Sequence, residues 1–297
     1  MTAMPGASYT GVLPALTEEG HALAARLRRH VETLAASQRN TDLETPAQYI
    51  ETAFAAHGLG PARHEFRSGE RTVRNVEVGA TSGSIVLVGA HYDTVPGSPG
   101  ADDNASGVAA LIELAGVLGK EGLPIRFVAF ANEEMPYFLS EEMGSWRSAR
   151  RSRERGETVR AMLSLEMLGY YRDTPRSQTY PPPLGLLYPD RANFIAFVGD
   201  LGARHLVRRA VGLFRKHAQF PSEGVAAPSF VPGVTWSDHW SFRRHGFPAV
   251  MVTDTAFNRY PHYHLPSDTP EKLDYERLAR VTLGLAGVLR ELAAENR

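Results

Sequence analysis

Residues 84–90 read Ser-Ile-Val-Leu-Val-Gly-Ala, an apolar run without polar alternation, and His91-Tyr92-Asp93 follows it directly. Such a run is typical of a central strand that is buried on both faces of a sheet. Similar runs occur at residues 127–131, 161–165, 194–198 and 248–252. Helical patterns occupy residues 108–118, 203–217 and 237–245. This alternation predicts an α/β fold: a single-domain three-layer sandwich whose central mixed, largely parallel sheet carries helices on both faces.

The segments on either side of these runs complete the predicted domain. Leucine and valine recur at helical spacing from 18 to 36, and Thr45 is predicted to cap a second helix that starts at Pro46. Short strands are expected at 62–67 and 72–79, and a final helix carries Leu278, Val281, Leu285, Val288 and Leu292 on one stripe. We therefore expect one catalytic domain over residues 1–297, with 1–60 as a helical leading segment packed on it.

One segment inside the predicted domain has a different composition. Residues 172–193 are rich in proline and tyrosine, and strand-like sequence resumes directly after them. We interpret the segment as a loop excursion rather than a linker. The sequence leaves open whether it covers a substrate or contacts another copy of the chain.

Composition excludes several classes of protein. The 297 residues are 43% hydrophobic and 22% charged, with a net charge of −1 and no cysteine. The charge balance argues against nucleic acid or a membrane surface as partner, and no apolar run reaches the roughly 18–20 residues of a membrane span. The lack of cysteine excludes disulfides and thiol catalysis. The N-terminus shows no basic segment followed by an apolar core, so we expect a cytoplasmic protein.

Acidic and histidine side chains follow the predicted strands, where ligands bind in open α/β sheets. The ligand candidates are His91, Asp103, one of Glu133 and Glu134, Glu166 and His264. Imidazole and carboxylate groups suit zinc, and this set suffices for two ions that share one carboxylate. One glutamate of the Glu133-Glu134 pair would remain free as a general base. Each motif alone has an ordinary structural explanation, and we assign His239 and His262 to structural or rim positions.

Four stretches together resemble the zinc-dependent exopeptidases, a family with bacterial leucyl aminopeptidases, glutamate carboxypeptidase II and glutaminyl cyclase among its members. They are VGAHYDTVPGSPGADDNASGVAALIELA (88–115), VAFANEEM (128–135), SLEMLG (164–169) and YHLPSDTPEKLD (263–274). The resemblance covers about residues 84–294 and keeps the family's motif order. Two features depart from the family pattern: Glu166 stands where the family often has Asp, and the usual Gly-Ser after the glutamate pair is displaced to Gly144-Ser145.

The resemblance implies a role for each candidate residue. His91 and Glu166 would bind one zinc ion, Glu134 and His264 would bind a second, and Asp103 would bridge the two. Asp93 would orient His91, and the Asp103–Asn104 peptide bond would be cis. Glu133 would be the general base. Tyr263 resembles a family tyrosine that donates to the oxyanion, although packing alone is an equal explanation.

We therefore expect a zinc-dependent metallo-exopeptidase, most simply an aminopeptidase that acts on peptides with a free N-terminus. Three alternatives stay open: a glutaminyl cyclase-like acyl transferase, a carboxypeptidase-type relative, and a catalytically silent binding protein on the same fold. The preferred side chain, the peptide length, the physiological metal and the oligomer do not follow from the sequence.

Overall fold

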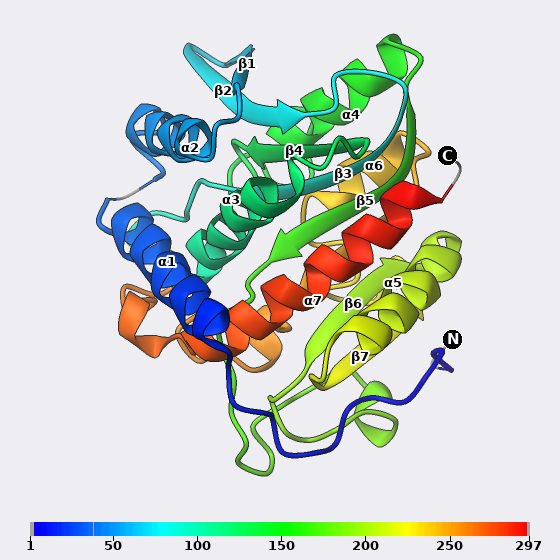
Figure 1. The fold of residues 1–297 in the computed structure, drawn as a ribbon. Coiled ribbons are helices and arrows are strands. Elements are labelled where there is room, and N and C mark those ends of the chain that lie inside the picture. Colours follow the sequence, from blue (N-terminus) through cyan, green and yellow to red (C-terminus); the bar gives the residue numbers. More distant parts are fainter. Residues whose placement is uncertain (1–2, 38, 296–297) are drawn as a thin grey trace.

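A mixed β-sheet forms the centre of the molecule, with helices in front of it and behind it (Figure 1). The computed structural model describes residues 3–37 and 39–295, and within them the sheet has eight strands in the order β1-β2-β4-β3-β5-β8-β6-β7. The strands are β1 (Ala62–Ser68), β2 (Arg71–Gly79), β3 (Ser84–His91), β4 (Ile125–Phe130), β5 (Thr158–Glu166), β6 (Ile195–Asp200), β7 (Ser222–Ala227) and β8 (Ala249–Thr253). The predicted α/β sandwich is confirmed. Residues 1–2, 38 and 296–297 of the predicted domain lie outside the described residues.

Strand direction places the ends of the central strands at one edge. β3 is parallel to both β4 and β5, and β5 is parallel to β8. β6 runs antiparallel to β8 and parallel to β7, while β1 and β2 form an antiparallel hairpin that joins the sheet through β4. The carboxyl ends of β3, β4, β5 and β8 therefore meet on one side of the molecule.

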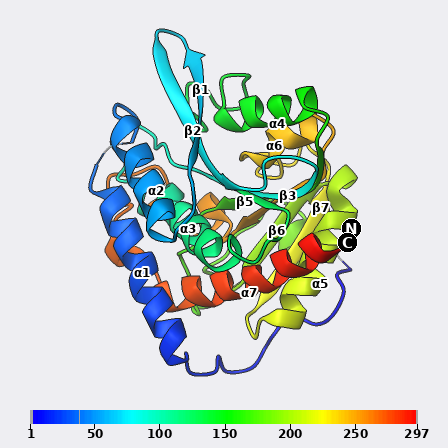
Figure 2. The same cartoon turned by 45° about the horizontal axis from the view of Figure 1, so that its top comes forward.

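Helices cover the two faces of the sheet unequally (Figures 1 and 2). One face carries α1 (Glu18–Ala35), α2 (Glu44–Ala56), α3 (Gly107–Leu118), α5 (Arg204–His217) and α7 (Tyr275–Ala294). The other face carries α4 (Gly144–Glu154) and α6 (His239–Arg244). Shorter helical segments span Ala101–Ser106, Leu184–Leu186, Leu201–Ala203, Ala256–Asn258 and Pro270–Lys272. No helix within 3–37 and 39–295 combines the length and the apolar character that a membrane crossing requires.

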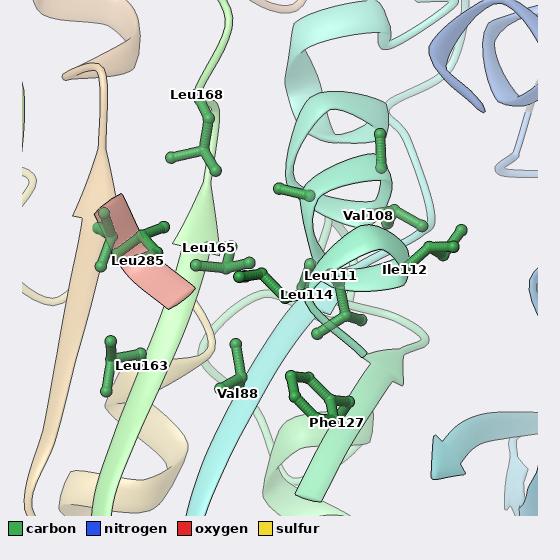
Figure 3. Packing of buried hydrophobic residues seen from close by; sticks show 14 of the residues in the cluster. Val88, Val108, Leu111, Ile112, Leu114, Phe127, Leu163, Leu165, Leu168 and Leu285 are labelled. Atoms are coloured by element: carbon green, nitrogen blue, oxygen red, sulfur yellow. The ribbon is translucent and has the colours of Figure 1, made fainter. Parts of the chain in front are cut away.

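The main core lies between α3 and the central strands. Figure 3 shows Leu111 and Leu114 of α3 directed toward Val88, Phe127 and the leucines of β5. Nearly every residue of α3 is buried, because α1, α2 and α7 cover the sides that do not face the sheet. A helix that is apolar almost all round requires such an environment. Its rigid packing fixes the chain immediately before it, which carries Asp103.

The start of α2 differs from the prediction. The helix begins at Glu44, and Thr45 is not its cap. The carboxylate of Asp42 accepts hydrogen bonds from the backbone N–H groups of Glu44 (2.9 Å) and Thr45 (3.1 Å). An aspartate just before a helix satisfies these free N–H groups better than a threonine inside the first turn.

Loops rather than a helix cover part of the second face, over β8, β6 and β7. There Ala196, Val198 and Met251 pack with Tyr180 of the 172–193 segment and with Val234. The segment thus lies against the sheet, in agreement with the predicted loop excursion. Sequence analysis did not predict β7, which pairs with β6 as an edge strand.

Candidate functional site

The predicted ligand residues come from five separate parts of the chain and meet at the carboxyl edge of the central strands. His91 ends β3, Glu134 follows β4, Glu166 ends β5, Asp103 precedes α3, and His264 follows β8. His91 Nε2 lies 3.4 Å from both Asp103 Oδ1 and Glu166 Oε1. His264 Nε2 lies 3.0 Å from Asp103 Oδ2 and 3.4 Å from Glu134 Oε1. All are buried except the His264 side chain, which is 35% exposed.

Three groups of candidate ligand side chains occur among the described residues: two of them share Asp103, and the third joins His91 with Glu133 and Glu134. The ligand atoms of His91, Asp103 and Glu166 lie within 4.8 Å of one another, and so do those of Asp103, Glu134 and His264. Each oxygen of Asp103 faces a different histidine. This arrangement has the form of two ion sites joined by one carboxylate. That these residues bind metal stays a prediction.

The electrostatics of the cluster favour a cation. Burial raises the pKa of Glu133 well above its ordinary value, and nearby carboxylates add to the effect. Burial and the charge of Asp103 raise the pKa of Glu134 to about 7. Asp103 is the exception, because its contacts with His264 and His91 outweigh burial and hold its pKa below the ordinary range. Buried carboxylates in excess of cationic partners are costly, so the donor set fits a divalent cation by charge as well as by ligand type.

Asp93 holds the turn that carries the glutamate pair. Its Oδ1 accepts a hydrogen bond from the backbone N–H of Glu133 (3.0 Å), and its Oδ2 accepts one from that of Glu134 (2.9 Å). Asp93 Oδ1 lies 3.6 Å from His91 Nδ1, which is longer than a hydrogen bond. Asp93 therefore orients the glutamates directly, and its predicted effect on His91 stays a prediction.

The loop before α3 is fixed from three directions. The Asp103–Asn104 peptide bond is cis, as the family resemblance implied. Asn104 Oδ1 accepts from the backbone of Gly107 (3.1 Å) and Met167 (3.0 Å). The Asp268 carboxylate accepts from the N–H groups of Asp102 (2.9 Å) and Asp103 (3.1 Å). The bridging candidate is thereby tied to both β5 and the loop that carries His264.

A buried arginine from the leading segment also holds this loop. Arg39 is fully buried, and its guanidinium donates to the carbonyl oxygens of Leu34, Tyr92, Pro99 and Gly100 at 2.6–2.9 Å. Burial lowers its pKa to about 10, and the carboxylates of the site oppose that shift. Sequence analysis missed Arg39, because a single arginine in a polar turn gives no signal of burial.

Two further residues near the cluster escaped prediction. Ser237 donates to Glu166 Oε2 (2.7 Å) and contacts Ser164 (2.8 Å), which fixes the carboxylate from behind. Asp238 is fully buried beside the cluster, and burial raises the pKa of its carboxyl to about 7. An acidic residue near the start of the helix predicted at 237–245 was the available signal. His239, which follows it, contacts the Val234 carbonyl (2.8 Å) and not the ligand groups.

Of the remaining predicted residues, Glu133 and Tyr263 lie at the cluster, and His262 lies away from it. The ring of Tyr263 stacks on the imidazole of His264, with centroids 3.8 Å apart, and lies 5.9 Å from the ring of Phe257. Glu133 Oε2 lies 4.0 Å from His91 Nε2. His262 contacts Ser267 (2.9 Å), away from the cluster. The base and oxyanion roles of Glu133 and Tyr263 stay predictions.

A cavity of about 370 Å³ opens from the cluster toward the loop-covered half of the sheet. Its first wall contains Asp103, Glu133, Glu134, Glu166 and His264. Its other walls are mainly apolar and aromatic, and they include Tyr180, Leu184, Tyr188, Phe194, Trp236, Met251 and Phe257. The 172–193 segment therefore forms part of a pocket wall. A mainly apolar cavity with polar groups at one end is typical of a small-molecule or side-chain site.

Comparison with known proteins finds relatives that align with most of the chain. YfbL of Escherichia coli, an uncharacterized protein, is 39% identical over 262 residues, which cover 84% of this chain and 80% of YfbL. A probable leucine aminopeptidase of Arthroderma otae is 29% identical over 265 residues, 83% of this chain but only 64% of that protein.

Solved structures share the fold. LapB of Legionella pneumophila superposes with a TM-score of 0.72 at 21% identity, over 97% of this chain and 79% of LapB. A glutaminyl cyclase of Bacteroides thetaiotaomicron superposes with a TM-score of 0.67 at 16% identity, over 94% of this chain and 99% of that chain. The profile of peptidase family M28 matches residues 73–289. Since this match covers most of the sequence, the chain belongs to peptidase family M28.

Proposed function

We propose that the protein is a zinc-dependent aminopeptidase that holds two zinc ions. The observation that carries the proposal is the pair of three-residue groups that share Asp103 at the end of an apolar cavity. Membership of a peptidase family and the similarity to a probable leucine aminopeptidase support the reaction class. His91, Asp103 and Glu166 would hold one ion, and Asp103, Glu134 and His264 would hold the other.

The protein's own groups have distinct roles in this proposal. Bound zinc would supply a Lewis acid that polarises the substrate carbonyl and lowers the pKa of water. Glu133, next to the ligand groups, would take a proton from the attacking water and pass it to the leaving amine. The carboxylate of Asp93 would keep Glu133 in place by accepting a hydrogen bond from the backbone N–H of Glu133. Tyr263, stacked on His264 at the cavity wall, would donate a hydrogen bond to the developing oxyanion.

The cavity favours removal of an N-terminal residue over the alternatives. A free α-amine beside the cluster would pair with Glu133 or Glu166, while the side chain of the same residue enters the apolar cavity. The intact set of five ligand candidates argues against a single-ion cyclase and against a silent binding protein. The substrate would thus be a peptide with a free N-terminus.

Metal and substrate measurements together test the proposal. Chelator-stripped protein that is reconstituted with zinc should bind two ions per chain, and Asp103→Asn should bind fewer. A plateau at one ion that Asp103→Asn leaves unchanged would remove the bridging assignment.

Three substrates separate the candidate reactions. Leucyl p-nitroanilide should be hydrolysed, a glutaminyl peptide should not cyclise, and an N-acetylated dipeptide with a free C-terminus should be spared. Ring closure with release of ammonia would identify the cyclase alternative, and cleavage of only the acetylated dipeptide would identify a carboxypeptidase. Inertness toward all three with metal bound would support the binding-protein alternative.

A further inference from the structure

The floor of the cavity is one row of residues that crosses four strands. Glu166 of β5 pairs with Thr253 of β8, Thr253 pairs with Ala196 of β6, and Ala196 pairs with Glu223 of β7. Directly paired residues direct their side chains to the same face of a sheet, and all four residues line the cavity. The row therefore runs from a candidate metal ligand to a second carboxylate at the far end.

The composition of this row makes a trough. Thr253 and Ala196 are small, and they lie between the two longer carboxylate side chains. Three strand spacings separate the main chains of Glu166 and Glu223, which is roughly 14 Å. A long side chain that starts beside the metal ligands can lie over Thr253 and Ala196 with its tip near Glu223.

The wall beside Glu223 presents aromatic carbon rather than polar groups. The rings of Tyr180 and Tyr188 stack with centroids 5.7 Å apart. The hydroxyl of Tyr180 donates to the Pro189 carbonyl (2.6 Å), and that of Tyr188 donates to the Gly224 carbonyl (2.7 Å). These hydroxyls are already paired within the protein, so the stacked pair offers an apolar aromatic face against which another aromatic ring can pack.

Glu223 is the carboxylate at the far end of the cavity. Among the described lining residues, the other carboxylates belong to the metal-ligand cluster. Its side chain is 20% exposed, and burial raises the pKa of the carboxyl. Its ion-pair partner Arg215 lies 3.7 Å away and donates to the Ser222 carbonyl (2.7 Å) and the Gly6 carbonyl (2.9 Å). Ser8 also hydrogen-bonds to the Glu223 side chain, and because a carboxylate offers about four acceptor sites, Glu223 keeps capacity to accept a further hydrogen bond.

The charge of Arg215 decides which donor fits. A lysine or arginine tip would meet this guanidinium as a like charge, whereas a neutral hydroxyl would not. We propose that Glu223 is a specificity-determining residue that accepts a hydrogen bond from the phenol of an N-terminal tyrosine, whose ring packs against the aromatic face of Tyr180 and Tyr188. This inference rests on the proposed aminopeptidase function and names its preferred substrate class.

The test compares tyrosyl and phenylalanyl p-nitroanilides with zinc-loaded protein. A hydrogen bond to a charged acceptor should favour the tyrosyl substrate by roughly 10- to 100-fold in kcat/KM. Glu223→Leu should reduce that ratio to about 1, because it removes the acceptor and keeps the bulk. The zinc content and the far-UV circular dichroism spectrum of the variant should match those of the wild type, which shows that the variant is folded.

Glu295→Leu is the matched control, because Glu295 likewise pairs with an arginine of α5, Arg209, but does not line the cavity. It should keep the wild-type ratio. Glu223→Gln, which retains an acceptor oxygen without the charge, should give an intermediate ratio.

The possible failures are distinguishable. Equal hydrolysis of the tyrosyl and phenylalanyl substrates by the wild type would overturn this inference and leave the proposed function standing. A preference for arginyl p-nitroanilide that Glu223→Leu abolishes would overturn the tyrosine assignment in favour of a cationic side chain. Inertness toward every aminoacyl anilide would overturn the proposed function and this inference with it.

Discussion

The two ends of the cavity are built in different ways. The ligand end consists of His91 and Glu166, the last residues of β3 and β5, Glu134 shortly after β4, and Asp103 and His264 from loops at the same edge. The far end consists of the edge strand β7 and two loops, around 180–188 and 231–236. Exposed apolar residues occur on these loops, with Leu186 88% and Phe230 84% exposed, whereas the ligand candidates are mostly buried.

This difference indicates that the two ends of the cavity have different roles. Groups that perform chemistry need positions accurate to a fraction of an ångström, and a sheet with buried hydrogen bonds supplies that accuracy. Groups that select a side chain can sit on loops, where changes in sequence disturb the fold little. Substitutions at the ligand end should therefore affect all substrates, and those at the far end should affect some substrates and not others.

The largest effect is expected for Glu133→Gln. If Glu133 is the general base, kcat should fall by at least about 10²–10⁴-fold for every substrate, while bound zinc stays unchanged. Glu134→Gln serves as the comparison and should instead weaken zinc binding. Zinc titration beside steady-state kinetics distinguishes the two. If Glu133→Gln loses zinc and Glu134→Gln keeps it, the two roles are reversed.

A smaller effect is expected for Tyr263→Phe. Loss of one oxyanion donor should lower kcat by roughly 10²–10³-fold with little change in KM. The phenylalanine ring can still stack on His264, so zinc content and thermal stability should match the wild type. A kcat close to that of the wild type would assign Tyr263 to packing alone.

The smallest effect, and the most selective one, is expected for Ala196→Leu. The larger side chain would fill the trough between Thr253 and Glu223, so kcat/KM for tyrosyl and phenylalanyl anilides should fall by roughly 10- to 200-fold. Alanyl p-nitroanilide, which does not enter the trough, should react at close to the wild-type rate and is the internal control. An equal loss for all three substrates would contradict the proposed separation of the two ends.

The same division explains what the sequence could predict. The buried strands were visible because continuous apolar runs mark the centre of a sheet, and the ligand candidates follow those runs directly. The strand β7 could not be predicted, since its sequence Ser-Glu-Gly-Val-Ala-Ala has few of the β-branched and aromatic residues that are typical of strands. The helix α4 was not predicted either, because its sequence is rich in charged residues and only one narrow face of it is buried.

The residues that form the walls of the cavity could not be predicted from the sequence, for a different reason. Tyr180 and Glu223 are 43 positions apart in the chain, and only the pairing of β6 with β7 and the course of the 172–193 segment bring them together. No spacing rule connects a tyrosine in a loop to a glutamate on an edge strand. Such contacts arise from tertiary structure, whereas the ligand motifs repeat one local rule at several strand ends.

The contacts of Arg39 bear on how much of the chain is needed to hold the candidate site in place. The family match starts at residue 73, so a chain shortened to that point would keep every candidate ligand. It would lose α1, α2 and the guanidinium that joins the carbonyl groups of Tyr92, Pro99 and Gly100. These carbonyls would then need other donors or solvent, and the segment that leads to Asp103 would lose its restraint. The leading segment thus supplies a residue that holds the loop of Asp103, and we expect a chain that begins at residue 73 to contain the candidate ligands but to hold them less firmly.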